Sequence, residues 1–388
     1  MLCLALGPSA VLVTGFGVFI HPVADAFHWS VGQVSFAVSL IALSLTFIAP
    51  LQGLLLDRFG ARRLVLYSIP CLGGGLIAMR WLPNSLFVFY AAWVMLPAAA
   101  IGIWPTSYLK TVSGWFDRQL GRAVGTANAG IGIGAIFIPP IASALIATWG
   151  WRNAFAGLGA MALLALPIAA LFLRENSESI ISVPLSSGGT RLTSSSASTV
   201  KQLLRNVDFR ILAIGYLAIG ITGTGTVANL IPLLLDSGMT LRMAVATTSA
   251  YGVAALSGRF LAGFLLDRYS FILVLNGFVA AAALATAGFA VGIHGNTAVF
   301  AAVLIGLIMG AEFDVLSYAV RQYFGMKIFG KVYGLIFGLF QLGASVGAAT
   351  IAICIHRTGN YHLAMWVFFG ALVIGFLVLS TARALPRR

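Results

Sequence analysis

One arginine and two carboxylic acids lie inside apolar runs that are long enough to cross a bilayer. Arg259 is eight residues, or about 12 Å along a helix, from the nearest polar loop. A central arginine costs about 2.5–3.5 kcal/mol on insertion, so it must face a cavity or a partner. Its guanidinium stays protonated and presents a fork of donors that fits a carboxylate. We therefore expect Arg259 to anchor a substrate carboxylate, or to pair internally with Glu312 or Asp314.

Three titratable residues are candidates for proton coupling. Glu312 and Asp314 lie about 16 residues into another apolar run and, two positions apart, face different directions on a helix. Burial favours the neutral form of a carboxyl, so either one could take up a proton and release Arg259 to an anion. Alternatively, both only neutralise Arg259 or Arg321. His21 ends the first run, where an imidazole either transfers protons or simply lies at the interface.

The composition excludes a soluble protein. Of 388 residues, 60% are hydrophobic and 9% are charged, whereas a soluble domain carries roughly 25% charged residues. The three cysteines are scattered and lack metal-ligand spacing. No nucleophile–base pair is apparent either. We therefore expect a protein in the lipid bilayer with no enzyme activity, no cofactor and no metal.

Twelve apolar runs have the length of membrane-spanning helices, about 20 residues each. They fall at about 4–27, 31–56, 64–82, 85–111, 121–147, 152–173, 208–235, 242–265, 271–292, 296–322, 330–356 and 360–382. The intervening stretch at 174–207 is rich in Ser, Gly and Thr, as flexible linkers are. The sequence thus predicts an all-α membrane protein with a six-helix bundle at 1–173, a linker at 174–207 and a second bundle at 208–388.

The basic residues predict the orientation of these helices. Eighteen of the 23 Lys and Arg residues flank the runs on the linker side, and only four flank the other side: Arg80, Arg152, Arg242 and Arg357. Loops rich in Lys and Arg remain in the cytoplasm. We expect the linker and both termini there. This asymmetry also accounts for the net charge of +13, so no nucleic-acid partner is expected.

The two halves repeat each other. The stretch GLLLDR at 53–58 recurs as GFLLDR at 263–268, an offset of 210 residues, and GRAVG at 121–125 recurs as GKVYG at 330–334, an offset of 209. Two matches at nearly one offset indicate parallel copies. Transporters built from such copies bind substrate near mid-membrane, where the repeats meet.

The repeated loop resembles the signature loop of the major facilitator superfamily. With the twelve runs, the resemblance covers the whole chain and implies two pseudo-symmetric six-helix bundles that work by alternating access. In that family the loop latches the cytoplasmic side shut in the outward-open state. A basic loop that only sets topology is the alternative, and both can hold. The gate candidates are Gly53, Asp57, Arg58, Gly60, Arg62 and Arg63, with Asp267 and Arg268 in the second copy. We expect Asp57 to cap a helix start and to pair with a basic residue.

The helices that line the pore of that superfamily supply further candidates for the cavity wall. They are Thr14, Phe19, Tyr108, Asn128, Asn229, Tyr318 and Gln341.

A finer resemblance concerns the second half. Residues 252–268 are similar to helix 8 of the monocarboxylate porter family, which includes the oxalate/formate antiporters, and 310–334 resemble its bacterial members. The match departs from the family in three helices, and the first of them, at 14–22, lacks the acid that opens helix 1 in the mammalian members. Ala255 replaces the acid one turn before the arginine, and the run at 330–356 carries Gln341 in place of the second deep cation of the oxalate exchanger. These departures disfavour dicarboxylate exchange.

The resemblance implies a secondary active transporter of the bacterial inner membrane. We expect it to move a small organic anion, a monocarboxylate such as lactate or pyruvate, by symport with H⁺. One alternative is organic-anion antiport of the oxalate/formate type without proton coupling. Another is a substrate-sensing receptor on a transporter fold, for which the short loops and linker offer little signalling surface. The expected partners are the anion, H⁺ and the lipid bilayer, and the oligomeric state is open.

Overall fold

The computed structural model describes residues 1–116, 119–175 and 200–382, and in these ranges all regular structure is helical. The α-helices are α1 Leu2–Ala5, α2 Ile20–Phe27, α3 Val31–Phe59, α4 Ala61–Ala78, α5 Leu86–Ala99, α6 Pro105–Trp115, α7 Leu120–Leu163, α8 Ala165–Phe172, α9 Val200–Arg205, α10 Val207–Ala228, α11 Leu230–Asp236, α12 Leu241–Leu266, α13 Phe271–Ala290, α14 Asn296–Phe324, α15 Phe329–Thr358 and α16 His362–Ser380. The π-helix η1 spans Ser9–Thr14, and the 3₁₀ helices η2 and η3 span Phe16–Phe19 and Met79–Trp81.

Within the described ranges, nine helices are apolar and long enough to cross a membrane, and a tenth crossing is the bent pair 2–14 and 16–27. An eleventh crossing is present because one of the nine helices, Leu120–Phe172, is 53 residues long. At 1.5 Å per residue it would extend about 80 Å, far more than the 30 Å of a hydrocarbon core. Gly150 breaks it with a φ of 75°, and Gly157 lies against Leu145, so the two arms fold back as two crossings.

The twelfth crossing consists of two short helices. Between α5 and α6 the chain departs from helical geometry at residues 100–104, and the freed polar groups find partners nearby. Gly102 donates its N–H to the Ser68 hydroxyl at 2.9 Å, and the Trp104 indole donates to the Pro97 carbonyl at 3.1 Å. Because these bonds replace the missing helical ones, the break is tolerated at membrane depth. Within the described residues, the all-α architecture and these twelve crossings agree with the prediction.

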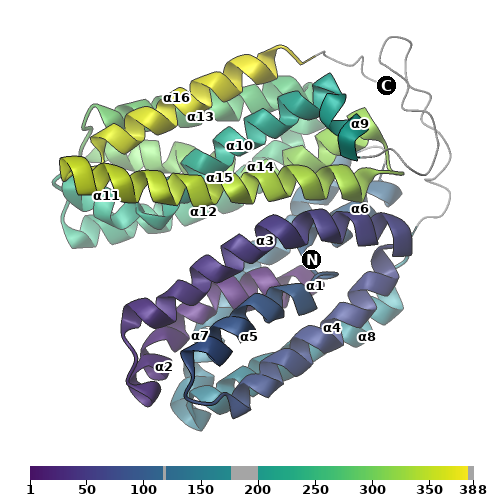
Figure 1. The fold of residues 1–388 in the computed structure, drawn as a ribbon. Coiled ribbons are helices and arrows are strands. Elements are labelled where there is room, and N and C mark those ends of the chain that lie inside the picture. The colour runs from purple at the N-terminus through teal and green to yellow at the C-terminus, as the bar shows by residue number, and fades with distance from the viewer. Residues whose placement is uncertain (117–118, 176–199, 383–388) are drawn as a thin grey trace.

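The helices form two bundles that run side by side (Figure 1). The purple-to-blue helices α1–α8 make one, and the teal-to-yellow helices α10–α16 make the other. A hydrophobic core lies wholly within 4–169, and a second core in the later half also takes in Ala49, Leu109, Leu120 and Val124. Those four residues lie towards the end of the molecule where Leu173 and Val200 are found, which we call the linker face. The two bundles are therefore packed together towards the linker face.

The division into two domains, with boundaries at 173 and 208, stays a prediction. Most of the linker proposed from the sequence, residues 176–199, lies outside the described residues.

Candidate functional site

Glycines bring the two halves into backbone contact at the linker face. A Cβ atom at Gly53 of α3 would collide with the carbonyl of Gly330 at the start of α15. In the repeat-related position, a Cβ at Gly263 of α12 would lie 2.6 Å from the carbonyl of Gly121 at the start of α7. Small residues at such positions allow helices to approach closely. The repeated sequence thus builds two equivalent seams, α3–α15 and α12–α7.

Asp57 ties the first seam together. Its carboxylate accepts the backbone N–H groups of Gly330 at 2.9 Å and Lys331 at 2.7 Å, which belong to the first turn of α15. It also pairs with the Lys110 ammonium at 2.7 Å, and its side chain is only 12% exposed. The first N–H groups of a helix lack internal partners and carry positive potential, so a carboxylate is stabilised there. The cap expected from the sequence therefore belongs to a helix 273 residues away.

Asp267 ties the second seam with fewer bonds. Its Oδ1 accepts the N–H of Gly121 at 3.0 Å, while Oδ2 lies 3.6 Å from the Arg122 Nε and accepts no hydrogen bond. The Arg268 guanidinium lies over the Phe264 ring at 4.1 Å. The two seams thus use the same residue types but are not equally bonded.

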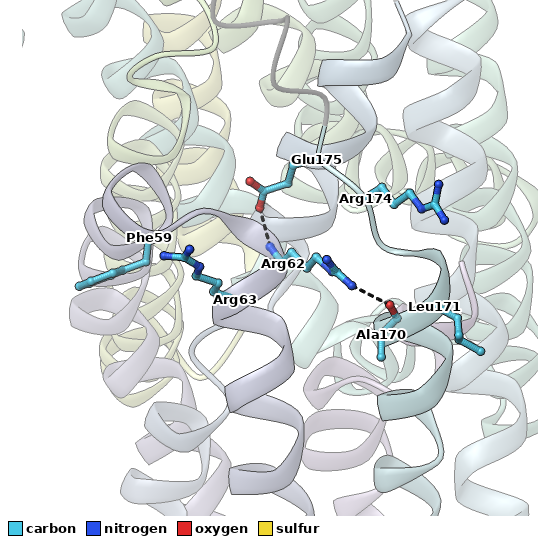
Figure 2. A pocket seen from close by; sticks show the side chains of 7 residues that line it. All are labelled: Phe59, Arg62, Arg63, Ala170, Leu171, Arg174 and Glu175. Atoms are coloured by element: carbon cyan, nitrogen blue, oxygen red, sulfur yellow. Dashed lines mark hydrogen bonds between the residues drawn. The ribbon is translucent and has the colours of Figure 1, made fainter.

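The other gate candidates lie on the outer side of the first bundle. Gly60 adopts a φ of 82° at the turn between α3 and α4, a conformation that favours glycine. Arg58 is exposed and lies over its neighbour Phe59 at 5.2 Å. Arg62 and Arg63 line a surface pocket with Glu175 (Figure 2). Of the basic residues in the signature loop, the structure brings none into the α3–α15 seam.

A fully buried carboxyl group bridges the halves deeper in the molecule. Asp314 of α14 accepts a hydrogen bond from the side-chain amide of Asn128 in α7, and both side chains are 0% exposed. The second oxygen of Asp314 has no hydrogen-bond partner and lies 3.7 Å from the Cβ position of Gly125. A bulkier residue at position 125 would intrude on this site.

Arg259 and Glu312 complete a charged cluster with Asp314. The charges of the three groups act on one another, yet in the described part of the chain Arg259 forms no ion pair. Its buried Nη1 has no hydrogen-bond partner, and neither has the Oε2 atom of Glu312, which is 2% exposed. Unpartnered buried polar atoms are rare and costly. The cluster therefore holds donors and acceptors that can still bind a ligand or a proton.

Three tyrosines that are not among the predicted residues interact with these carboxyls. Tyr216 of α10 donates its hydroxyl to the backbone carbonyl of Glu312 at 2.8 Å and is fully buried. Tyr251 and Tyr333 interact electrostatically with Glu312 as well. A tyrosine in the middle of an apolar run was the available signal, because a buried hydroxyl needs a partner.

The remaining candidates are dispersed. Phe19 is fully buried and stacks on Phe155 at 4.0 Å. Thr14 donates its hydroxyl to the Ala10 carbonyl of its own helical turn. Other placements are as follows: His21 is exposed in α2, Tyr108 is buried in α6 and interacts with Cys3, Asn229 donates to Gly225 at the α10–α11 break, and Tyr318 and Gln341 are half-buried in α14 and α15.

Comparison with known proteins decides the family. The sequence profile of the Major Facilitator Superfamily matches residues 2–348. The chain belongs to the major facilitator superfamily. It is therefore a multi-pass membrane transporter of a small solute and not an enzyme, and the resemblance drawn from its signature loop is confirmed.

Relatives span nearly the whole chain at low identity. Monocarboxylate transporter 11 of Mus musculus is 26% identical over 398 residues, covering 98% of this chain and 86% of that protein. The uncharacterized MFS-type transporter YhjX of Escherichia coli is 25% identical over 325 residues, covering 81% and 77%. Among solved structures, the E. coli fucose:proton symporter FucP superimposes with a TM-score of 0.74 at 15% identity, over 98% of this chain and 97% of that chain. That last likeness concerns the fold alone.

Proposed function

We propose that this transporter moves a small monocarboxylate, such as lactate or pyruvate, together with a proton across the bacterial inner membrane. The observation that carries the proposal is the Arg259 guanidinium, which has a buried, unpartnered Nη1 among residues of α12 in the membrane. A half-buried guanidinium with a buried Nη1 and no ion pair among the described residues favours an anionic ligand, and a carboxylate matches its fork of donors. The monocarboxylate transporters among the relatives support the same substrate class.

The charge balance of the cluster supports proton coupling. Arg259 contributes one positive charge, and Glu312 and Asp314 contribute two negative charges when both are ionised. Net charge is costly in a buried site, so the empty cluster favours one proton on its two carboxyls. A bound monocarboxylate adds one negative charge, which a second proton on the other carboxyl neutralises. This charge balance predicts that one proton is carried with each anion.

The two seams supply the gate for alternating access. With the seams closed at the linker face, the cluster is cut off from that side, and opening requires the bonds of Asp57 and Asp267 to break. The excess of basic residues on the linker side supports a cytoplasmic location for this face. The gate is then cytoplasmic and shut.

Uptake into proteoliposomes tests the proposal. Radiolabelled lactate, pyruvate and oxalate are supplied with and without an inward proton gradient, to wild type, Arg259→Lys, Arg259→Ala and Glu312→Gln. Arg357→Gln, at the opposite end of the molecule, is the matched control for loss of an arginine.

We expect gradient-driven uptake of a monocarboxylate by wild type and by Arg357→Gln. Arg259→Ala is expected to lose it, while Arg259→Lys, which keeps the charge but not the fork, retains a weak activity. Exchange that ignores the gradient in wild type would replace symport by organic-anion antiport. Uptake that survives Arg259→Ala would refute the anchor.

A further inference from the structure

A basic pocket opens on the outside of the first bundle at the linker face. It has a volume of about 760 Å³ and is lined by Phe59, Arg62, Arg63, Ala170, Leu171, Arg174 and Glu175. Figure 2 shows these side chains where the α3–α4 turn meets the end of α8. The pocket is remote from the Arg259 cluster, and neither the proposed transport step nor the two seams accounts for it.

The charges in this pocket are only partly used within the protein. Arg62 donates its backbone N–H to Glu175 at 2.5 Å and its guanidinium to the Ala170 carbonyl at 3.0 Å. The side chains of Arg63 and Arg174 have no hydrogen bond or ion pair among the described residues. Three arginines against one glutamate leave an excess of two positive charges. In Figure 2 the side chains of Arg63 and Arg174 extend in opposite directions, with Arg62 between them.

The apolar surface beside the pocket indicates what kind of anion fits. Leu171 and Phe172 at the end of α8 are 68% and 79% exposed, and Tyr67 one turn into α4 from the arginines is 76% exposed. In a membrane-spanning bundle such side chains face lipid chains. The pocket therefore has cationic side chains at the ends of the helices and an apolar surface beside them. These two features match the charged headgroup and the acyl chains of one phospholipid molecule.

We infer that this pocket binds an anionic phospholipid, with the headgroup in the pocket lined by Arg62, Arg63 and Arg174 and the acyl chains along Leu171 and Phe172. The excess positive charge of the lining arginines favours a headgroup of net negative charge over a zwitterionic one. A soluble phosphate offers the same charge but gains nothing from the apolar surface.

Native mass spectrometry of the full chain in detergent tests this inference. Phosphatidylglycerol and phosphatidylcholine with identical acyl chains are titrated onto wild type, R63Q/R174Q and R63K/R174K. The control is R80Q/R357Q, which removes two arginines from the other end of the molecule. Glycerol 1-phosphate is added as a soluble competitor in a separate arm.

We expect wild type to prefer phosphatidylglycerol over phosphatidylcholine. One basic residue near an anionic lipid corresponds to about a fivefold change in affinity, so R63Q/R174Q should bind phosphatidylglycerol about 30-fold more weakly. R63K/R174K keeps the charges and should retain most of the affinity, and the control should match wild type. Unchanged binding by R63Q/R174Q would overturn the inference. Displacement of phosphatidylglycerol by equimolar glycerol 1-phosphate would also overturn it, in favour of a site for soluble anions.

Discussion

The carboxyl–carboxamide bond between Asp314 and Asn128 is a side-chain link between the two halves in the interior of the protein. It joins α14 to α7 with both partners fully buried. A bond in that position can be replaced by water only when the halves separate. The protonation state of the Asp314 carboxyl is thereby coupled to the contact between the two bundles.

Asn128→Ala should destabilise the protein more than an ordinary loss of a hydrogen bond. Asp314 would lose its donor and remain buried, which costs about 1–3 kcal/mol or more for a charged group. Thermal unfolding in detergent measures the effect as a lower midpoint. Asn276→Ala, which removes an exposed bond to Ser380, is the control and should change stability by less than about 0.5 kcal/mol.

The exchange N128D/D314N offers a stricter version of this test. It restores a carboxyl–carboxamide pair with the carboxyl on the other helix, so the unfolding midpoint should recover towards wild type. A midpoint as low as that of Asn128→Ala would mean that the pair is not what stabilises this contact.

At the scale of the elements, the seams depend on backbone contact at glycines. The α3–α15 seam places Gly53 directly on the carbonyl of Gly330, with Gly334 packed on the carbonyl of Ala49 one turn further on. Side chains cannot be accommodated between such surfaces without moving a helix. The closed gate is therefore more sensitive to the size of the side chain at these positions than to its polarity.

Gly53→Ala should hold the linker face open. The added methyl group collides with backbone that cannot shift alone, and overpacking of this kind typically costs about 1–3 kcal/mol. Gly74→Ala in α4 is the control, because no atom lies within 4 Å of its Cβ position and alanine favours helix. Transport by Gly53→Ala should fall well below that of Gly74→Ala, and equal rates would show that the seam does not close during the cycle.

Because the two seams are bonded unequally, we expect substitutions of Asp57 and Asp267 to have effects of unequal size. Asp57→Asn removes the charge that three donors share, whereas Asp267→Asn removes one that a single N–H and a more distant arginine share. A carboxylate at a helix N-terminus is typically worth 0.3–1 kcal/mol and up to about 2 when partly buried. We expect Asp57→Asn to shift the population towards an open linker face more strongly.

Spin labels on Phe59→Cys and Tyr269→Cys, repeat-related and exposed positions, can measure that shift in a background without the native cysteines. A longer distance component should grow in Asp57→Asn and less so in Asp267→Asn. A larger change in Asp267→Asn would contradict the ranking of the seams.

The sequence predicted the elements well because hydrophobic length is a local property. The runs at 296–322 and 330–356 correspond closely to α14 and α15. It also indicated the cap role of Asp57, through the repeated loop. It could not show that Asn128 meets Asp314, 186 positions away, because a helix that is apolar on every face gives no signal for which side packs where. For the same reason the predicted cavity-wall residues do not lie together in the structure, and Phe19 lies in the hydrophobic core.

At the scale of the whole molecule, the charge balance of the cluster has an electrical consequence. If each monocarboxylate travels with one proton, the cycle moves no net charge across the membrane. A cycle that moved one charge would gain about 2.3 kcal/mol per 100 mV, or about a 50-fold change in accumulation. The stoichiometry is therefore open to measurement.

Accumulation of the labelled monocarboxylate should not change when a potassium diffusion potential of about 100 mV is imposed at constant pH on both sides. A proton gradient of equivalent size should change it about 50-fold, since it acts on the carried proton. Accumulation that follows the potential would exclude one-to-one symport and indicate a second proton or an uncompensated anion.

The two seams differ in strength. We therefore expect the two bundles to rotate about the stronger seam when the gate opens, instead of separating equally at both seams. The α3–α15 edge, held by the three donors to Asp57, would act as the hinge, and the α7–α12 edge would separate first. A solute released at the linker face would then leave past Arg122 and Phe264, on one side of the molecule. The exit would have a direction although the fold is nearly symmetric.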